Sequence, residues 1–350
     1  MVYKKILGVL NNNDDKELIL SAFFAFLIRV LGALSGFVAT FVIARKLGAA
    51  ESGYYFLALS IITVLAAVAR VGLDNTVLRF VGASPELAVD VIKKSAAVIL
   101  ISGAICGAVC YGLAYFISMH VFGKPELAPV IQNMALGIMG LSALTIAAMA
   151  LQGLRKVSAS IFVLNIAVNF IVVILLLGLG IESADFLAAI YSIGAVAVAI
   201  VGFVFLYFTR PSELPVAISW RTLYASCGPL WIVVIMAQMV QWSGQFVAGI
   251  YVSSELVAQL AVAQRTAILS SFILIAVNLV VAPRFANLYR HKKMAELEIL
   301  AIKSVKLIAL FALPVIGGML IFPSFLMGLF GPEFVDGARL LQILAVGQFI

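Results

Sequence analysis

The stretch from Leu18 to Phe80 determines the class of fold. Its first part, Leu18–Leu47, reads LILSAFFAFLIRVLGALSGFVATFVIARKL, and its second part, Tyr54–Val71, reads YYFLALSIITVLAAVARV. Each part is long enough to cross the hydrocarbon layer of a bilayer as an α-helix, which takes about 20 apolar residues. A soluble core has no room for two such helices in succession. The sequence therefore predicts two transmembrane helices joined by a turn at Ala49–Gly53.

The composition extends this prediction to the whole chain. Of its 350 residues, 64% are hydrophobic and only 11% are charged, and the mean hydropathy is +1.17. Globular domains carry about a quarter of their residues as charged side chains. The apolar segments are long and lack the polar alternation of membrane β-barrel strands. We expect an all-α integral membrane protein, a polytopic helix bundle with apolar segments at 18–47, 53–72, 93–119, 128–153, 157–180, 185–209, 226–251, 256–283, 304–329 and 335–350.

Lysine and arginine are distributed unevenly between the connections of these segments, of which 73–92, 210–225 and 284–303 are the longest. The N-terminal segment and the even-numbered loops hold 17 of them, whereas the odd-numbered loops hold only Arg45, Lys46 and Lys124. Cytoplasmic loops carry the excess of positive charge in membrane proteins. The bias predicts a multi-pass protein of the cell (cytoplasmic) membrane with a cytoplasmic N-terminus. It also accounts for the net charge of +7, so no nucleic acid partner is expected.

Two short similarities indicate an internal repeat. Glu51 follows the first apolar segment and Glu255 follows the seventh, and Arg-Phe pairs come at similar distances after them, at 79–80 and 284–285. Six segments, an even number, separate the copies, so both halves have the same orientation in the membrane. We expect two parallel pseudo-repeat lobes, 18–217 with six helices and 218–350 with at least four, after a cytoplasmic segment at 1–17. The second lobe is expected to be incomplete, because residue 350 lies within an apolar segment.

Several motifs resemble one family of transporters. They are Arg29–Gly32, Phe41–Ala49, Glu51–Tyr55, Gln264-Arg265 and Phe330–Phe334. Together they resemble the Wzx-type polysaccharide-biosynthesis flippases of the multidrug/oligosaccharidyl-lipid/polysaccharide (MOP) exporter superfamily. The resemblance implies two six-helix lobes around a central cavity, and an oligosaccharide linked to a polyprenyl pyrophosphate, of the undecaprenyl type, as the substrate. Membrane lipids and a polysaccharide polymerase with its chain-length machinery are further partners that it implies.

Two arginines are suited to replace the hydration that a pyrophosphate loses in the membrane. Arg29 and Arg265 lie well inside apolar segments, where a charge is costly unless it faces protein, water or a ligand. Guanidinium groups bind phosphate oxygens in pairs. Both arginines are therefore predicted to bind substrate in a cavity between the lobes. The alternative is structural: each snorkels, caps a carbonyl or pairs with a carboxylate such as Asp74 or Glu255.

Amide side chains within the helices are candidates for glycan binding, because they donate and accept hydrogen bonds without net charge. The predicted set consists of Asn165, Asn169, Gln238, Gln241 and Gln245. The three glutamines are three and four residues apart, so they share one face of their helix, beside Trp242. Such a face lies either on a cavity or against another helix, and we expect the cavity.

Four basic residues near the membrane surfaces are candidates for the places where the head group enters and leaves. Arg70 and Arg79 lie at the predicted cytoplasmic end of the second apolar segment, where an interfacial ion network is the favoured alternative. Arg45 and Lys46 are exceptions to the charge bias, because they lie in an odd-numbered loop on the predicted outer side of the membrane. They either hold an anionic head group at the exit or snorkel to lipid phosphates.

Two prolines, Pro229 and Pro314, lie inside apolar segments. Proline removes a backbone hydrogen bond and can bend a transmembrane helix. Alternating access requires helices that bend or rock, so both prolines are candidate hinges. The alternative is that they are fixed kinks that only shape the packing.

The predicted function is a flippase that moves a polyprenyl-pyrophosphate-linked oligosaccharide by alternating access, for cell-surface polysaccharide biosynthesis. We expect neither an enzyme nor a cofactor. We also expect no metal site, since the two histidines, His120 and His291, both lie in loops and cannot form a convincing one. The alternatives are a lipid-linked peptidoglycan-precursor flippase and a cation-coupled multidrug exporter, which is disfavoured because no carboxylate lies deep in a segment. A membrane-embedded glycan polymerase would need a sizeable loop with an acid or base. A scaffold would be favoured if Arg29 and Arg265 were dispensable.

Overall fold

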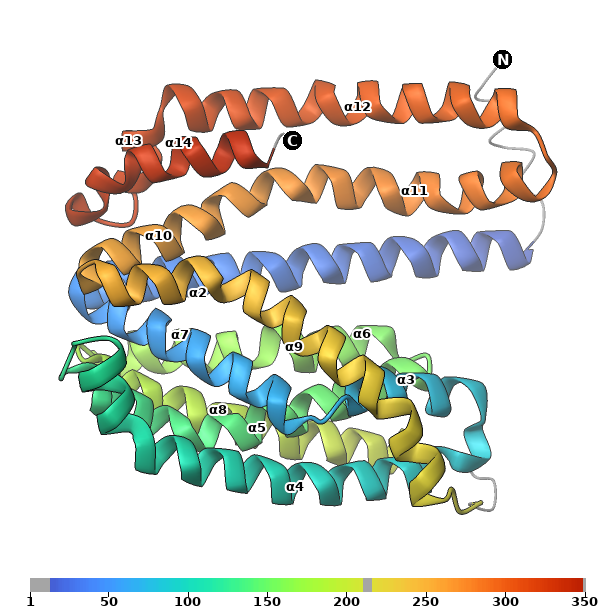
Figure 1. Ribbon diagram of the computed structural model, residues 1–350. Coiled ribbons are helices and arrows are strands. Elements are labelled where there is room, and N and C mark those ends of the chain that lie inside the picture. Colours follow the sequence, from blue (N-terminus) through green and yellow to red (C-terminus); the bar gives the residue numbers. More distant parts are fainter. Residues whose placement is uncertain (1–12, 210–215, 349–350) are drawn as a thin grey trace.

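The helices of this protein lie side by side in an N-terminal and a C-terminal group, and the first helix of the chain, drawn in dark blue, runs between the two groups beside the C-terminal one (Figure 1). The computed structural model describes residues 13–209 and 216–348, leaving aside the side chains at positions 13–26, 29, 276, 279, 280 and 283. Within these ranges the chain is almost entirely helical and contains no strand. The all-α prediction is confirmed.

The first two apolar segments form one element, α2 (Asn13–Ala69), which is bent at Gly48. Gly48 has φ 74° and ψ 178°, a conformation that is essentially restricted to glycine. The predicted turn at Ala49–Gly53 is wrong, because the helix resumes directly after the glycine. Alanine and glutamate favour helix, so one glycine is sufficient to reverse the chain here.

The rest of the N-terminal half is a bundle built around one central helix. Its elements are α3 (Leu73–Ala83), α4 (Pro85–Phe116), η1 (Ile117–Val121), α5 (Leu127–Gly153), α6 (Val157–Ile161), η2 (Phe162–Ile166), α7 (Ala167–Leu179) and α8 (Ala184–Thr209). The central helix is α5, which packs on α2, α3, α4 and α8. A Cβ at Gly140 would lie 2.8 Å from the backbone nitrogen of Val196. The absence of a side chain there brings the backbones of α5 and α8 into contact.

The C-terminal half is connected to the first by a long helix that crosses between the two groups (Figure 1). Its elements are α9 (Trp220–Tyr251), α10 (Ser254–Ala267), η3 (Ile268–Ser270), α11 (Ser271–Arg290), α12 (Met294–Ile321), α13 (Pro323–Gly328), η4 (Pro332–Gly337) and α14 (Ala338–Gly347). The crossing helix is α9, which packs on α2 and α3 as well as on α10. Its Trp231 donates a hydrogen bond from Nε1 to the carbonyl of Val68 at 3.0 Å.

Two stretches predicted as polar connections are largely helical. The stretch 73–92 contains α3 and the first turns of α4, and 284–303 contains the end of α11 and the beginning of α12. Hydropathy indicates where a helix leaves the hydrocarbon layer, whereas the helix itself continues into the interfacial region. This is why the apolar segments underestimate the lengths of these helices.

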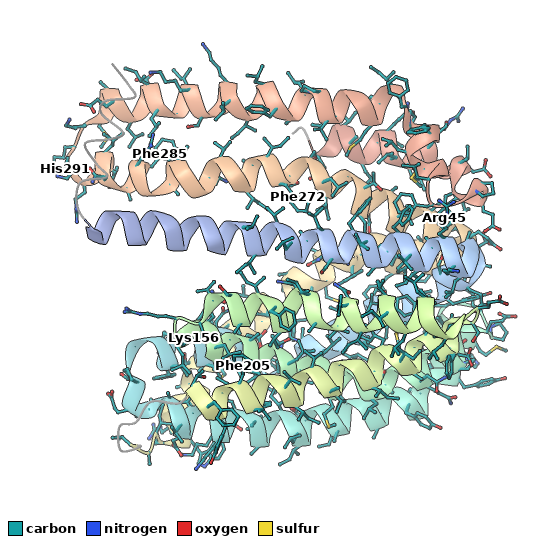
Figure 2. The ribbon with its side chains drawn as sticks, turned by 180° about the vertical axis from the view of Figure 1, so that it is seen from behind. Arg45, Lys156, Phe205, Phe272, Phe285 and His291 are labelled. Carbon is teal, nitrogen blue, oxygen red and sulfur yellow. The ribbon has the colours of Figure 1, made fainter. Side chains whose placement is uncertain are left out.

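Eight helices in the described parts of the chain are long and apolar enough to cross a membrane. The first of them runs from Val30 to Ala69 and includes the bend at Gly48, which divides it in two. The protein is therefore a multi-pass membrane protein. Lys156 and His291 lie at one end of the molecule and Arg45 lies at the other (Figure 2).

Candidate functional site

A cavity of about 480 Å³ lies between the two halves of the molecule. One wall is a face of α2 with small side chains, on which Gly32, Gly36 and Thr40 follow at helical spacing. The facing walls come from α8 and from the C-terminal half, where Trp242 of α9 and Arg265 of α10 line the cavity. Residues from both halves therefore meet at one site.

An irregular helical turn supplies the amide part of the wall. The five residues of η2, which include Asn165, form a π-helix between α6 and α7, and π-turns occur frequently at functional sites. The carbonyl of Asn165 accepts hydrogen bonds from Ser35 Oγ at 2.7 Å and from Asn169 Nδ2 at 2.8 Å. Because Gly32 has no side chain, this turn can lie directly against α2; a Cβ there would be 3.0 Å from the Asn165 Cβ. Asn165 and Asn169 both line the cavity.

The charge of the cavity comes from Arg265, which follows Gln264 on α10. The Arg265 side chain is exposed, and none of the ion pairs among the described residues includes it. Of the two carboxylates considered as partners, Asp74 pairs with Arg70. Within the part of the chain that the structure describes, Arg265 is the only charged residue lining this cavity. The described wall is therefore cationic.

Aromatic rings complete the cavity. Trp242 donates a hydrogen bond from Nε1 to Oε1 of Gln238 at 3.1 Å, one helical turn earlier. This bond orients the indole from within α9. Tyr55 of α2 and Tyr191 of α8 also line the cavity, with ring centroids 6.3 Å apart in an edge-to-face arrangement. A cation, amides and aromatic rings are thus brought together in one site.

The glutamines of α9 lie differently from the prediction. Among the described residues that line the cavity, Gln238, Gln241 and Gln245 are absent. Gln245 is buried, and its Nε2 donates to the carbonyl of Val257 at 3.3 Å, so it joins α9 to α10. Gln238 supports Trp242, and Gln241 is exposed. Their spacing predicts a common face correctly but cannot tell which neighbour that face contacts.

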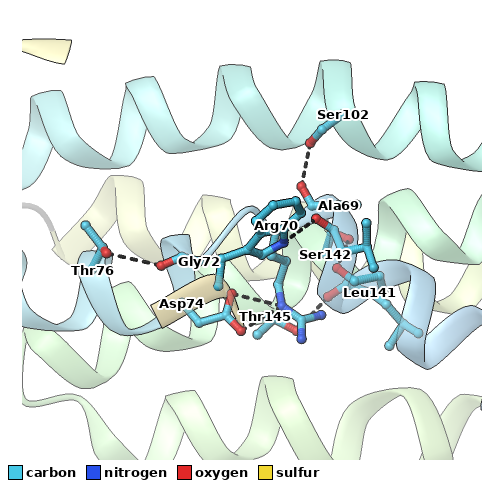
Figure 3. Close-up of polar contacts among 12 residues, drawn as sticks. Ala69, Arg70, Gly72, Asp74, Thr76, Ser102, Leu141, Ser142 and Thr145 are labelled. Carbon is cyan, nitrogen blue, oxygen red and sulfur yellow. Dashed lines mark hydrogen bonds and ion pairs between the residues drawn. The ribbon is translucent and has the colours of Figure 1, made fainter. Parts of the chain in front are cut away.

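Arg70 and Asp74 form a buried ion pair where α2 ends and α3 begins (Figure 3). The exposed fractions of these residues are only 7% and 9%. Arg70 Nε donates to both carboxylate oxygens, at 2.9 and 2.8 Å. The geometry matches the structural alternative for Arg70, an ion network, more closely than a site open to substrate.

The three other basic candidates are exposed. The guanidinium of Arg79 lies 5.0 Å from the centre of the neighbouring Phe80 ring. Arg45 donates from Nη1 to the carbonyl of Leu329, in the C-terminal half, at 3.1 Å. Arg45 thus joins the N-terminal half to the C-terminal half. Neither head-group binding nor snorkelling to lipid, the two predicted roles, included this contact.

The remaining candidates are two prolines and Arg29. Pro229 lies inside α9 and Pro314 inside α12. Pro314 lines a second, apolar pocket of about 660 Å³ between α2, α10 and α12. The side chain of Arg29 lies outside the described part of the chain.

Four polar residues of the cavity wall were missed by sequence reasoning: Thr40, Tyr55, Thr63 and Tyr191. Threonine and tyrosine are common in apolar helices, so neither stands out in a hydropathy profile. A usable signal was the run of small residues at Gly32, Gly36 and Thr40, because small residues at helical spacing mark the face of a membrane helix that other helices approach.

The chain matches the family model described as "Polysaccharide biosynthesis protein" over residues 18–289. It belongs to this family. No curated protein sequence gives a match. Among solved structures, one similar in fold is a MATE-family multidrug resistance transporter of the MOP superfamily in an inward-facing conformation. The TM-score is 0.70 at 17% identity, over 93% of this chain and 82% of the transporter.

Two further solved structures have the same fold. One is the MATE multidrug transporter DinF-BH with a ligand bound, with TM-score 0.62 and 13% identity over 96% of this chain and 86% of that protein. The other is a MOP superfamily transporter from Pyrococcus furiosus, with TM-score 0.62 and 17% identity over 94% of this chain and 78% of that protein.

The chain is thus a member of the polysaccharide biosynthesis protein family that has the fold of MOP superfamily transporters. The predicted resemblance and the fold class are thereby confirmed.

Proposed function

We propose that the protein translocates a polyprenyl-pyrophosphate-linked oligosaccharide across the cytoplasmic membrane by alternating access, for cell-surface polysaccharide biosynthesis. The observation that carries this proposal is the guanidinium of Arg265, which has no ion-pair partner among the described residues, on the wall of the cavity between the halves. A fixed cation among apolar helices is costly, and binding an anion offsets that cost. Guanidinium groups bind phosphate oxygens through paired, charge-assisted hydrogen bonds. The polyprenyl tail would remain in the lipid.

Arg29 is proposed as a second cation on the ground of its position in the chain. It precedes Gly32 by three residues and Gly36 by seven, a spacing that belongs to one face of an α-helix. Both glycines line the cavity. Arg29 on α2 and Arg265 on α10 would then belong to opposite halves and bind the pyrophosphate together.

The uncharged part of the cavity supports a glycan as the group that follows the pyrophosphate. Asn165, Asn169 and Gln264 provide amides, which can donate to and accept from sugar hydroxyls. Trp242, oriented by Gln238, provides a flat apolar surface. In this proposal Gln238 acts through Trp242, and Gln245 through the packing of α10, while Gln241 has no assigned contact.

The main alternative is a multidrug exporter, because solved MATE transporters share the fold. A cationic drug needs an anionic partner in its binding site, but the described residues that line this cavity include no carboxylate. The transporter from Pyrococcus furiosus is one in which reverse polarity of the binding pocket suggests a different function. The polarity of the cavity therefore favours an anionic substrate. A peptidoglycan-precursor flippase shares this chemistry, and only transport measurements separate the two substrates.

The orientation in the membrane is proposed from the distribution of charge. Lys156 and His291 lie at the end of the molecule opposite Arg45 (Figure 2), and the basic loops of the first end are proposed to be cytoplasmic. Arg79 would then attract the anionic head group at the cytoplasmic end, and Lys46 at the outer end. For Arg70 and Arg45, whose guanidinium groups bind protein, structural roles are proposed instead.

Complementation tests this function. The full gene is expressed in a bacterium that lacks its own polysaccharide flippase, and surface glycan and undecaprenyl-linked intermediates are measured. We expect the wild type to restore surface glycan and Arg265→Ala to reduce it by about tenfold or more, since hydrogen bonds to charged groups contribute about 1.5–3 kcal/mol. Arg265→Lys should retain part of the export, because it keeps the charge but loses the paired geometry.

The matched control is Arg221→Ala, which removes an exposed arginine at the start of α9, outside the cavity lining. It should leave export unchanged. Full export by Arg265→Ala at normal membrane levels would remove Arg265 from the mechanism. Resistance to cationic dyes without any restored glycan would instead establish the multidrug exporter.

A further inference from the structure

At the end of the molecule that carries Arg45, the two halves contact each other outside the cavity. After the bend at Gly48, the amide of Ala49 begins a new helical segment and has no acceptor within it. Glu333 of η4, in the other half, accepts a hydrogen bond from this amide at its Oε2, 2.7 Å away. A carboxylate at a helix N-terminus is favourable because the helix dipole is positive there. Glu333 thus caps a helix that belongs to the opposite half.

The loop before Glu333 is held by residues of α2 that precede the bend. Arg45, just before the bend, donates to the carbonyl of Leu329 at 3.1 Å. The ring of Phe330 is buried and lies against Phe37 and Phe41 of α2, with centroids 5.8 and 5.4 Å apart. The segment 329–333 therefore reaches across to α2 with a buried ring and hydrogen bonds.

A second segment of similar sequence contacts the opposite half through its phenylalanine and its lysine, while its glutamate, Glu126, accepts from Tyr54 Oη of its own half at 3.4 Å. Phe-Gly-Lys-Pro-Glu at 122–126 resembles Phe-Gly-Pro-Glu at 330–333, and each follows the third apolar segment of its half. Lys124 donates from Nζ to the carbonyl of Gly249 on α9 at 2.6 Å. Phe122 is buried, and its ring lies at the Gly249 position, where a Cβ would be only 2.9 Å from it. Burial lowers the pKa of Lys124, and Glu255 opposes this shift.

Between the two segments, the helices of opposite halves touch through their backbones. A Cβ at Gly53 of α2 would overlap the carbonyl of Ser254, at the start of α10. Glycine is thus required at this crossing for the halves to come so close. The contacts through Ala49, Gly53 and Gly249 lie near the same end of the helices, beyond the cavity.

We propose that the segments 122–126 and 329–333 are two copies of one device that closes the outer side of the cavity, and that Glu333 is the contact whose release opens it. We call these segments and the Gly53–Ser254 crossing the outward gate. The outward direction of this gate rests on the orientation proposed above. The closure of the gate does not depend on the identity of the substrate.

Glu333 is suited to a contact that forms and breaks in each cycle. Its side chain is exposed, so water can replace the Ala49 amide as its partner when the halves separate. The backbone of η4 stays anchored in its own half, because Gln259 Nε2 donates to the Glu333 carbonyl at 2.8 Å. Opening therefore requires the loss of the side-chain contact and not the unfolding of η4.

The gate is tested by the accessibility of the cavity from outside. In a full-length protein whose native cysteines are replaced by alanine, Thr63→Cys places one thiol on the cavity wall. Intact cells are treated with a membrane-impermeant maleimide, and the labelling rate is measured. We expect Glu333→Ala to raise this rate by about fivefold, the factor for the loss of one hydrogen bond of about 1 kcal/mol. Gly53→Val should raise it as well, because its side chain forces the crossing apart.

The matched control is Glu296→Ala, which removes an exposed carboxylate at the opposite end of the molecule, where it pairs with Lys293. It should leave labelling unchanged. Unchanged labelling of both Glu333→Ala and Gly53→Val, at wild-type membrane levels, would overturn the gate. The readout needs no substrate, so a gate that opens as expected in a protein that exports no glycan would refute the proposed substrate alone.

Discussion

At the scale of single residues, two arginines of this protein have opposite surroundings. Arg70 is buried and donates to both oxygens of Asp74, whereas Arg265 is exposed on the cavity wall and has no carboxylate partner among the described residues. A buried charge whose partner is lost is strongly destabilising. An unpaired charge that faces a cavity retains its capacity to bind an anion. We therefore propose that Arg70 serves stability and that Arg265 binds the substrate.

The Arg70–Asp74 pair gives a prediction for stability. We expect Asp74→Asn to lower the stability of the protein by about 3–5 kcal/mol, because it leaves a buried guanidinium without its counter-charge. Thermal unfolding of the purified protein in detergent measures the effect. Glu296→Gln is the control, since its pair with Lys293 is exposed and such pairs contribute about 0–1 kcal/mol. Equal melting temperatures for the two variants would show that the buried pair is not structural.

Part of the site can be predicted from the residues alone. Asn165, Asn169 and Arg265 stand out because polar and charged side chains are costly in apolar helices, and all three line the cavity. Tyr191 and Thr40 do not stand out, because their side chains are compatible with apolar surroundings. Whether such a residue faces lipid, another helix or a cavity depends on the packing of helices far apart in the sequence.

At the scale of elements, α2 owes its shape to one glycine. Gly48 has a backbone conformation that is essentially restricted to glycine, and it places two long helical segments on opposite sides of the bend. It also leaves room for Glu333, whose Oε2 would lie 3.2 Å from a Cβ at this position. The bend and the gate contact thus depend on the same residue.

Replacement of this glycine is therefore expected to be costly. Gly48→Ala should lower stability by about 1–3 kcal/mol, the usual cost of such a strained backbone, as measured by thermal unfolding in detergent. The control is Gly112→Ala in α4, where a Cβ would meet no atom within 4 Å. That change should be neutral or stabilise by up to about 1 kcal/mol, because alanine favours helix over glycine. A Gly48→Ala variant as stable as the control would contradict the assigned role of the bend.

The order and class of the elements can be predicted from hydropathy, but their ends cannot. The apolar segments identify where the chain crosses the membrane, and the break near Gly48 is expected from the sequence. Hydropathy does not reveal α3, the first turns of α4 or the end of α11. These helices continue into polar surroundings and contain charged residues such as Arg79 and Arg290. α3 instead packs its buried residues, among them Leu73 and Val77, on α5.

At the scale of the whole molecule, two halves with a cavity between them are joined at one end by the outward gate. The crossing helix α9 belongs to both halves, since its first turns pack on α2 and α3 and its last turns meet α10. Pro229 lies inside α9 and remains a proposed hinge for the motion of one half against the other, as does Pro314 inside α12. The repeat predicted from Glu51 and Glu255 stays a prediction, and the similarity of the segments 122–126 and 330–333 supports it.

Translocation in a purified system tests the central claim most directly. The full-length protein is reconstituted into vesicles that contain a labelled polyprenyl-pyrophosphate oligosaccharide, and the glycan that reaches the opposite leaflet is measured with a membrane-impermeant reagent. We predict that the wild type translocates the glycan, and that Arg265→Ala does so at least about tenfold more slowly while Arg221→Ala matches the wild type. Equal rates for Arg265→Ala and the wild type, or a wild type no faster than protein-free vesicles, would contradict the account.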